Sequence, residues 1–90
     1  MRLGWRKDAL DDLDRIFEFN AERSEALAMK VERRLTARAQ ALTIAPHLGR
    51  ALQEAGAFRL SVTDIQYVID YELAEDLVLI ARIRSTREIR

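Results

Sequence analysis

Apolar and polar positions divide this chain into a helical first half and a strand-like second half. Leu3 and Trp5 alternate with their neighbours, which is typical of a short strand. After Asp8, the apolar positions are separated by four, three and one residues, and this spacing places them on one face of an amphipathic helix. These positions are Ala9, Leu13, Ile16 and Phe17.

A second helix is predicted after a break in this pattern at residues 20–24. Ser24 is a suitable N-cap, because its hydroxyl can accept a hydrogen bond from a free N–H of the first turn. Pro46 closes the helix a few residues after its last apolar position. Two helices with so short a connection form an antiparallel hairpin. The apolar stripe is Leu27, Val31, Leu35, Ala39 and Leu42, and Lys30, Arg33, Arg34 and Arg38 form a basic face interpreted as solvated.

The second half of the chain predicts an antiparallel meander of three strands. A two-residue turn at Thr63-Asp64 would place Leu60 opposite Tyr67, and a loop at residues 74–76 would place Tyr67 opposite Ile83. This register keeps arginines off the core face, where an unpaired charge is costly. We therefore expect an α+β fold in a single domain, residues 1–90: a short N-terminal strand, then an antiparallel helix hairpin packed on a C-terminal three-stranded antiparallel sheet.

The open face of that sheet holds the candidate chemistry. Arg59 stands between Phe58 and Leu60, so it points away from the core face. Asp70 is near enough to act as its counter-charge. A face that mixes arginines with aliphatic residues is typical of a docking surface, and a solvated face with an Arg59–Asp70 ion pair is the alternative. The predicted surface consists of Arg59, Val68, Asp70, Val78, Ile80, Arg82 and Arg84.

Composition narrows the classes of protein that remain. A hydrophobic fraction of 49% with 33% charged residues excludes disorder, and the absence of cysteine excludes thiolate chemistry. His47 is the only histidine and has no second ligand at metal spacing, so we expect no metal site and no cofactor. A net charge of zero argues against nucleic-acid binding by the chain alone. We find no secretory signal or membrane-length apolar run and expect a cytoplasmic protein.

The order of these elements and residues resembles the ParE/RelE superfamily of bacterial toxins from type II toxin–antitoxin systems. The likeness covers nearly the whole chain, although no single element is diagnostic. The residues that carry it are Ala9, Asp12-Leu13 and Ile16 in the first helix, Leu42, Pro46, Gly49 and Arg50 around the loop, Arg59-Leu60, Tyr67, Ile69, Tyr71 and residues 80–83 in the strands, and Arg87.

The resemblance leaves three functions open. RelE-like members are similar to ribosome-dependent endoribonucleases of messenger RNA, and here Arg59, Arg82 and Arg84 would stabilise the developing phosphorane charge. The superfamily's frequent His-Gly-Arg segment reads Ser85-Thr86-Arg87 in this chain, and no tyrosine follows, so a general acid and base are missing. We therefore assign no catalytic residue. An inactive relic that only binds its antitoxin is the third possibility.

The ParE-like branch implies a non-enzymatic inhibitor of DNA gyrase, which needs a binding surface and no base. We favour this reading, with neutralisation by a cognate antitoxin in a hetero-oligomer and no contact with membranes. The antitoxin is expected to cover grooves and the open sheet face. The expected antitoxin contacts are Arg59, Val68, Asp70, Val78, Ile80 and Arg82, and the expected target contacts are Arg84, Arg87 and Arg90.

Overall fold

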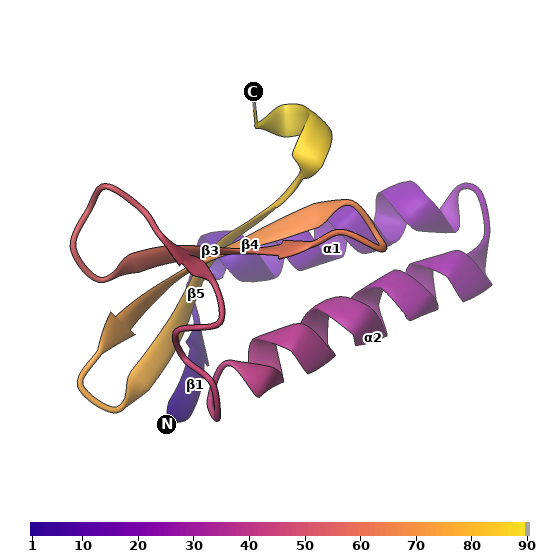
Figure 1. Cartoon of the computed structure of the whole chain (residues 1–90). Helices are drawn as coiled ribbons and strands as arrows, with labels where there is room; N and C mark the ends of the chain where they lie inside the picture. The colour runs from indigo at the N-terminus through magenta and orange to yellow at the C-terminus, as the bar shows by residue number, and fades with distance from the viewer. Residues whose placement is uncertain (90) are drawn as a thin grey trace.

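A five-stranded mixed sheet carries both helices on one of its faces (Figure 1). The computed structural model describes residues 1–89. The strand order in the sheet is β1-β5-β4-β3-β2. In chain order the elements are β1 (Arg2–Trp5), α1 (Lys7–Ala21), α2 (Glu25–Ala41), β2 (Arg50–Ala51), β3 (Ala57–Val62), β4 (Tyr67–Ala74), β5 (Leu77–Ser85) and the 3-10 helix η1 (Thr86–Glu88).

The helix hairpin follows the prediction closely. The Ser24 hydroxyl accepts a hydrogen bond from the Leu27 N–H at 3.2 Å, so Ser24 is the N-cap of α2. Both helices turn small and aliphatic side chains toward the sheet, where they are almost fully buried. None of the helices in residues 1–89 is long and apolar enough to cross a membrane. The buried helical residues in the core are Ala9 and Ile16 from α1 and Val31, Leu35 and Ala39 from α2.

The sheet is larger than the predicted three-stranded meander. The expected N-terminal strand is present as β1, and it lies parallel to β5, with Leu3 opposite Val78. At the other edge, the two-residue strand β2 pairs with β3. The two added strands flank the antiparallel meander of β3, β4 and β5, and the parallel pairing of β1 with β5 makes the sheet mixed.

The register of β3 and β4 differs from the prediction by two residues. Leu60 lies opposite Ile69, and Val62 lies opposite Tyr67, so the turn spans Thr63 to Gln66. Gln66 closes this turn in the left-handed region, with a φ of 62°. Because the side-chain period of a strand is two residues, a two-residue shift leaves every side chain on the predicted face.

A β-bulge in β5 overturns part of the predicted open face. Asp70 pairs with Arg82, but the next residue, Tyr71, pairs with Ile80, so Ala81 is an extra residue. Val78 and Ile80 were expected on the open face, and both have 0% exposure in the core. The bulge reverses the alternation, so two β-branched side chains reach the core where an unbroken strand would place Ala81 and Leu79.

The loop before β2 closes over the Tyr71 hydroxyl. This hydroxyl donates to the Pro46 carbonyl at 2.7 Å and accepts from the Gly49 N–H at 2.9 Å. A Cβ atom on Gly49 would lie 2.8 Å from both the Arg59 carbonyl oxygen and the Tyr71 hydroxyl. Only glycine therefore fits at this position without displacing backbone.

We predict that Gly49→Ala lowers the free energy of unfolding by about 1–3 kcal/mol, because the added methyl overpacks the loop against β3. Urea unfolding at neutral pH measures this change. The matched control is Gly4→Ala, whose Cβ would meet only methyl groups of Leu77 and Leu79, at 3.3 and 3.5 Å. Equal losses in the two variants would contradict the close approach at Gly49.

Candidate functional site

The open face of the sheet is organised around the carboxylate of Asp70. Arg59 lies directly opposite Asp70 in the register and binds it through two hydrogen bonds, of 2.6 and 3.0 Å. Arg84 donates to the same carboxylate at 2.9 Å. The Arg59 and Asp70 side chains are only 18% and 14% exposed. The Arg59–Asp70 ion pair of the solvated-face alternative is therefore present, but the pair is mostly buried rather than solvated.

The environment of Asp70 favours its ionised form. Burial raises the pKa of the Asp70 carboxyl, but hydrogen bonds and charge from Arg59 and Arg84 outweigh burial, and the pKa lies below its ordinary value of 3.8. Beside this cluster, Val68 is 3% exposed. The predicted apolar strip of the open face is therefore almost absent from the surface, since Val78 and Ile80 lie in the core.

Arg82 does not join the Asp70 cluster, although the register places the two residues opposite each other. Its guanidinium instead binds Asp12 of α1 with two hydrogen bonds, of 2.8 and 3.1 Å. Asp12 also accepts from Arg15 at 3.0 Å and from the Ile83 N–H at 2.8 Å. The arginines of the predicted surface are thus divided between two carboxylates.

Asp12 completes the hydrogen bonding of the sheet edge. The pairing of β1 with β5 ends where Trp5 meets Ile80, so the Ile83 N–H lies beyond the end of β1. The Asp12 carboxylate, 5% exposed, takes the place of a strand partner for this N–H. Burial raises the pKa of Asp12, but hydrogen bonds from Arg82, the Ile83 N–H and Arg15 outweigh it and lower the pKa below 3.8.

Sequence reasoning did not identify the structural role of Asp12, although a signal was present. Asp12 follows Ala9 by three residues and precedes Ile16 by four, so it lies within the apolar stripe of the helix. A carboxylate on a buried helix face requires a cationic or N–H partner. The partner residues could not be named from the helix alone, because they lie about 70 positions away in β5.

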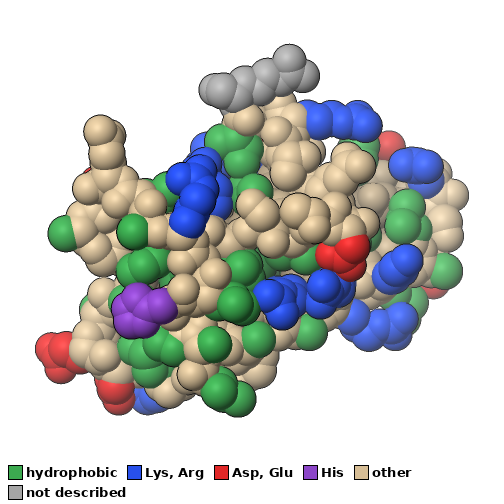
Figure 2. All heavy atoms as spheres, in the orientation of Figure 1, with side chains coloured by type: hydrophobic (Ala, Val, Ile, Leu, Met, Phe, Trp, Pro, Cys, Tyr) green, Lys and Arg blue, Asp and Glu red, His purple; other side chains and the backbone are tan. Residues whose placement is uncertain are grey.

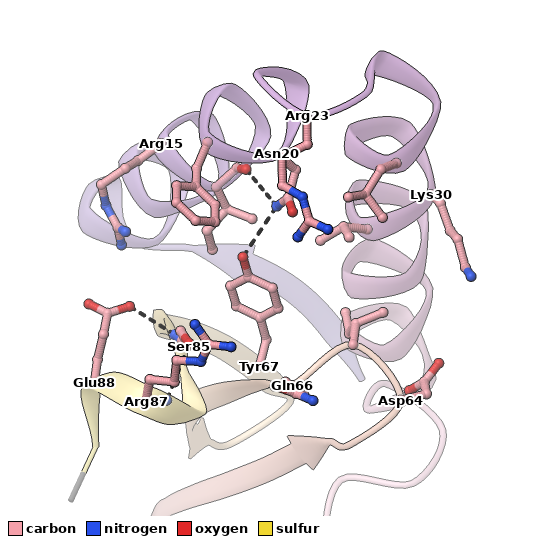
Figure 3. A pocket seen from close by; sticks show the side chains of 15 residues that line it. Arg15, Asn20, Arg23, Lys30, Asp64, Gln66, Tyr67, Ser85, Arg87 and Glu88 are labelled. Carbon is pink, nitrogen blue, oxygen red and sulfur yellow. Dashed lines mark hydrogen bonds between the residues drawn. The ribbon is translucent and has the colours of Figure 1, made fainter.

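A second candidate surface is a groove of about 700 Å³ at the joined end of the helix hairpin (Figure 3). The turn between β3 and β4 and the segment after β5 form its opposite wall. Tyr67 lies within the groove, and its hydroxyl accepts a hydrogen bond from the buried Asn20 amide at 3.2 Å. Apolar lining comes from Ile16, Phe19, Leu27, Val31 and Ile65, and charged lining comes from Arg15, Arg23, Lys30, Asp64, Arg87 and Glu88.

The predicted target-binding residues have different surroundings. Arg84 is partly buried and tied to Asp70, whereas Arg87 is exposed on η1. A capping box fixes η1, because the Ser85 hydroxyl accepts from the Arg87 N–H and the Glu88 carboxylate accepts from the Ser85 N–H. Arg90 lies outside the described residues. Among residues 1–89, no group of three His, Asp or Glu side chains is arranged to hold a metal ion.

We predict that Asp12→Asn lowers the free energy of unfolding at pH 7 by about 2–4 kcal/mol, because two arginines lose their buried counter-charge. The folded-state pKa of Asp12 is lowered, so its contribution is present above the ordinary pKa and is lost as the pH falls through the folded value. The difference between wild type and variant should therefore narrow below about pH 4. Urea unfolding at pH 7 and pH 3 measures both effects.

Asp14→Asn is the matched control for this experiment. Asp14 is an exposed residue of the same helix and has no ion pair within residues 1–89. We expect this variant to unfold as the wild type does at both pH values. A gap between wild type and Asp12→Asn that is as wide at pH 3 as at pH 7 would contradict a charge-based role for Asp12.

Comparison with known structures identifies the same architecture elsewhere. A chain of the chromosomal ParDE toxin–antitoxin system from P. aeruginosa superposes with a TM-score of 0.83 at 20% identity, covering 94% of this chain and 95% of that one. A chain of the intact E. coli RelBE toxin–antitoxin complex gives a TM-score of 0.71 at 12% identity, with 93% and 94% covered. The isolated E. coli RelE toxin gives 0.69 at 12%, with 93% and 82% covered. These likenesses show the fold.

Sequence comparison identifies the family. No curated protein matches the chain significantly. The family model described as the ParE toxin of the type II toxin–antitoxin system parDE matches residues 3–90, which is nearly the entire chain. The sequence-based resemblance to the ParE/RelE superfamily is confirmed, and this chain belongs to the ParE toxin family of type II toxin–antitoxin systems.

Proposed function

We propose that this ParE-family toxin inhibits DNA gyrase by binding to it, without a chemical step of its own. The observation that carries the proposal is the state of the open-face arginines. Arg59 and Arg84 share the Asp70 carboxylate, and Arg82 is held by Asp12. Paired guanidiniums are poorly placed to stabilise a developing phosphorane, and Ser85-Thr86-Arg87 supplies no group that titrates near neutral pH.

A cognate antitoxin is the proposed neutralising partner. The solved relatives belong to systems described as ParDE and RelBE, in which a toxin is accompanied by an antitoxin. On the open sheet face, Arg59, Asp70 and Arg82 are the proposed contacts, whereas the predicted contact Val68 is buried. We propose that the hetero-oligomer forms in the cytoplasm, where gyrase acts on DNA.

The proposed contact with gyrase is the basic C-terminal segment, in which Arg87 is exposed. We predict that the purified toxin inhibits gyrase supercoiling, and that Arg87→Glu weakens this inhibition without lowering the melting temperature. Arg33→Glu, an exposed arginine of α2, is the control and should inhibit as the wild type does. Full supercoiling activity in a several-fold molar excess of wild-type toxin would refute gyrase as the target.

The RelE-type ribonuclease is the second candidate, because Arg59 on β3 and Arg82 and Arg84 on β5 lie on the two strands that flank β4, and the isolated E. coli RelE toxin is among the solved relatives. Primer extension on messenger RNA from cells that express the toxin separates the two functions. We expect intact transcripts during growth arrest, whereas cuts at fixed codon positions would favour the ribonuclease. Normal growth without the antitoxin would favour an inactive relic.

We predict that Arg59→Ala lowers the free energy of unfolding by about 1–3 kcal/mol, because it leaves the mostly buried Asp70 carboxylate with Arg84 alone. Arg59→Lys is the informative comparison: it keeps the charge but loses the planar fork that binds both carboxylate oxygens. Thermal and urea unfolding measure the change. An unchanged midpoint in Arg59→Ala would show that the pair does not stabilise the fold.

A further inference from the structure

We propose that the outer face of the helix hairpin binds a second copy of the toxin, so that two hairpins pack as a four-helix dimer. The outer face is the side of α1 and α2 that is turned away from the sheet, and the side chains along it are exposed. Its apolar seam and the opposite charges of its two helices carry the proposal. The inference does not depend on which molecule the toxin inhibits.

Apolar side chains follow the seam between the two helices on this face. Phe17 is half-buried and lines a surface hollow together with Asp14 of the same helix and Glu32 of α2. Leu10 precedes Asp14 by four residues and Met29 precedes Glu32 by three, so both lie on the sides of their helices that border the hollow. Leu10 and Met29 are 47% and 44% exposed. An exposed apolar seam is typical of a helix pair that packs against another pair.

The two helices carry opposite charges on the outer face. The outermost row of α1 holds three carboxylates and one lysine, whereas the outermost row of α2 holds two cations and two alanines. Both rows advance by alternating steps of four and three residues, so each is a continuous stripe on its helix. Figure 2 shows Lys and Arg side chains gathered over α2. The rows are Lys7, Asp11, Asp14 and Glu18 in α1 and Ala26, Lys30, Arg33 and Ala37 in α2.

The central charges of these rows have no counter-charge inside the chain. Within residues 1–89, no ion pair involves Asp14, Glu18 or Arg33. Surfaces of opposite charge attract each other and fix the orientation in which they meet. Because the acidic stripe and the basic stripe lie on one face of one molecule, the surface that complements this face is a second copy of it.

A two-fold axis that lies in the interface and runs parallel to the helices brings the stripes together. It lays α1 of each copy along α2 of the other and keeps every residue at its own level along the hairpin. Asp14, Glu18 and Glu32 line the same hollow, so Arg33, the neighbour of Glu32, is level with the two carboxylates of α1. Arg33 of each copy therefore meets Asp14 and Glu18 of the other, and the two apolar seams meet at the axis.

The composition of the stripes argues against other occupants. The carboxylates of the α1 stripe would repel the phosphates of a nucleic acid or of an anionic membrane. Ala26 and Ala37 have short side chains, and the distance between packed helices depends on the size of the side chains at their contact. The α2 stripe therefore suits close packing against another helix.

The size of the outer face predicts a weak dimer. Helices of 15 and 17 residues are about 22 and 25 Å long. Two such helices side by side offer an area at the low end of the range for specific interfaces. We therefore expect a dissociation constant in the micromolar range, and separate copies at the lower concentrations used for unfolding and supercoiling measurements.

The dimer leaves the other proposed surfaces accessible. Arg59 and Asp70 lie on the open face of the sheet, which the helices do not cover. Arg87 lines the groove at the joined end of the hairpin and not the hollow on the outer face. Each dimer therefore presents two open sheet faces and two C-terminal segments.

The test measures the mass of the purified full-length toxin by sedimentation equilibrium at micromolar concentrations and low salt. We expect a monomer–dimer equilibrium in the wild type that weakens at high salt, because its ion pairs are near the surface. Arg33→Glu and Asp14→Arg each place like charges opposite each other at two symmetric positions. We expect the dissociation constant of each variant to rise about tenfold or more at low salt.

An equimolar mixture of Arg33→Glu and Asp14→Arg is the most specific measurement. In a mixed dimer, the two substituted side chains lie opposite each other with opposite charges, and the other symmetric position keeps Arg33 against Asp14. We expect the mixture to dimerise with nearly wild-type affinity, although neither variant does so alone. A general loss of structure in either variant would not give this rescue.

Arg87→Glu is the matched control, because it makes the same change of charge at an exposed arginine that lies outside the outer face. This variant should dimerise as the wild type does, and melting curves verify that every variant is folded. Met29→Ser, which changes no charge, should weaken the dimer with little dependence on salt.

Three outcomes would overturn the inference. The first is a wild-type toxin that stays monomeric throughout the micromolar range. The second is a mass that continues to rise beyond that of a dimer, because this would indicate an open head-to-tail contact instead of a closed two-fold one. The third is a dimer that Arg33→Glu and Asp14→Arg do not weaken, or that their mixture does not restore, because such a dimer would use another face.

Discussion

The Asp12 carboxylate is the interaction on which the arrangement of this molecule depends. It is almost fully buried, and a buried charge is tolerated only where opposite charges and hydrogen-bond donors surround it. Arg82 and the Ile83 N–H meet this requirement from β5, and Arg15 meets it from α1 itself. The carboxylate therefore ties the first helix to the exposed end of the sheet edge. Since Arg15 and Phe19 follow on the same helix, this tie also sets one wall of the groove.

The arginines of the open face hold buried carboxylates, and this structural role limits their ability to stabilise a reacting phosphate. The planar guanidinium matches a carboxylate through two parallel hydrogen bonds, and both Arg59 and Arg82 are bound in this way. A ribonuclease would need such groups directed at a phosphate, whereas a protein that only binds can keep them in ion pairs that stiffen a surface. Within residues 1–89, Arg23, Lys30 and Arg87 have no ion pair, and these three cations line the groove beside the C-terminal segment.

Prediction from the sequence succeeded where neighbouring residues carry the information. The helix hairpin and the Ser24 cap follow from local spacing, and both are present. The predicted strand pairings were wrong in both hairpins, since Tyr67 lies opposite Val62 and Ser85 rather than opposite Leu60 and Ile83. In the first hairpin, the turn at residues 63–66 depends on a left-handed Gln66, and the sequence has no glycine or asparagine there to indicate it. The bulge at Ala81 was missed because a strict period of two was assumed along β5. It moved Val78 and Ile80 from the candidate site to the core.

By itself, the sequence determined the order of the two helices and the four longer strands, and the buried face of residues 57–62, because these depend on local periodicity. It also determined the likeness to the ParE/RelE superfamily, which depends on residues in a fixed order. Only the tertiary structure decided which charged groups meet. Arg82 pairs with Asp12 rather than with its cross-strand neighbour Asp70, and the groove arises where the hairpin, a turn and the C-terminal segment come together. These outcomes depend on three-dimensional register and on the need to compensate buried charge, and neither is encoded in the spacing of nearby residues.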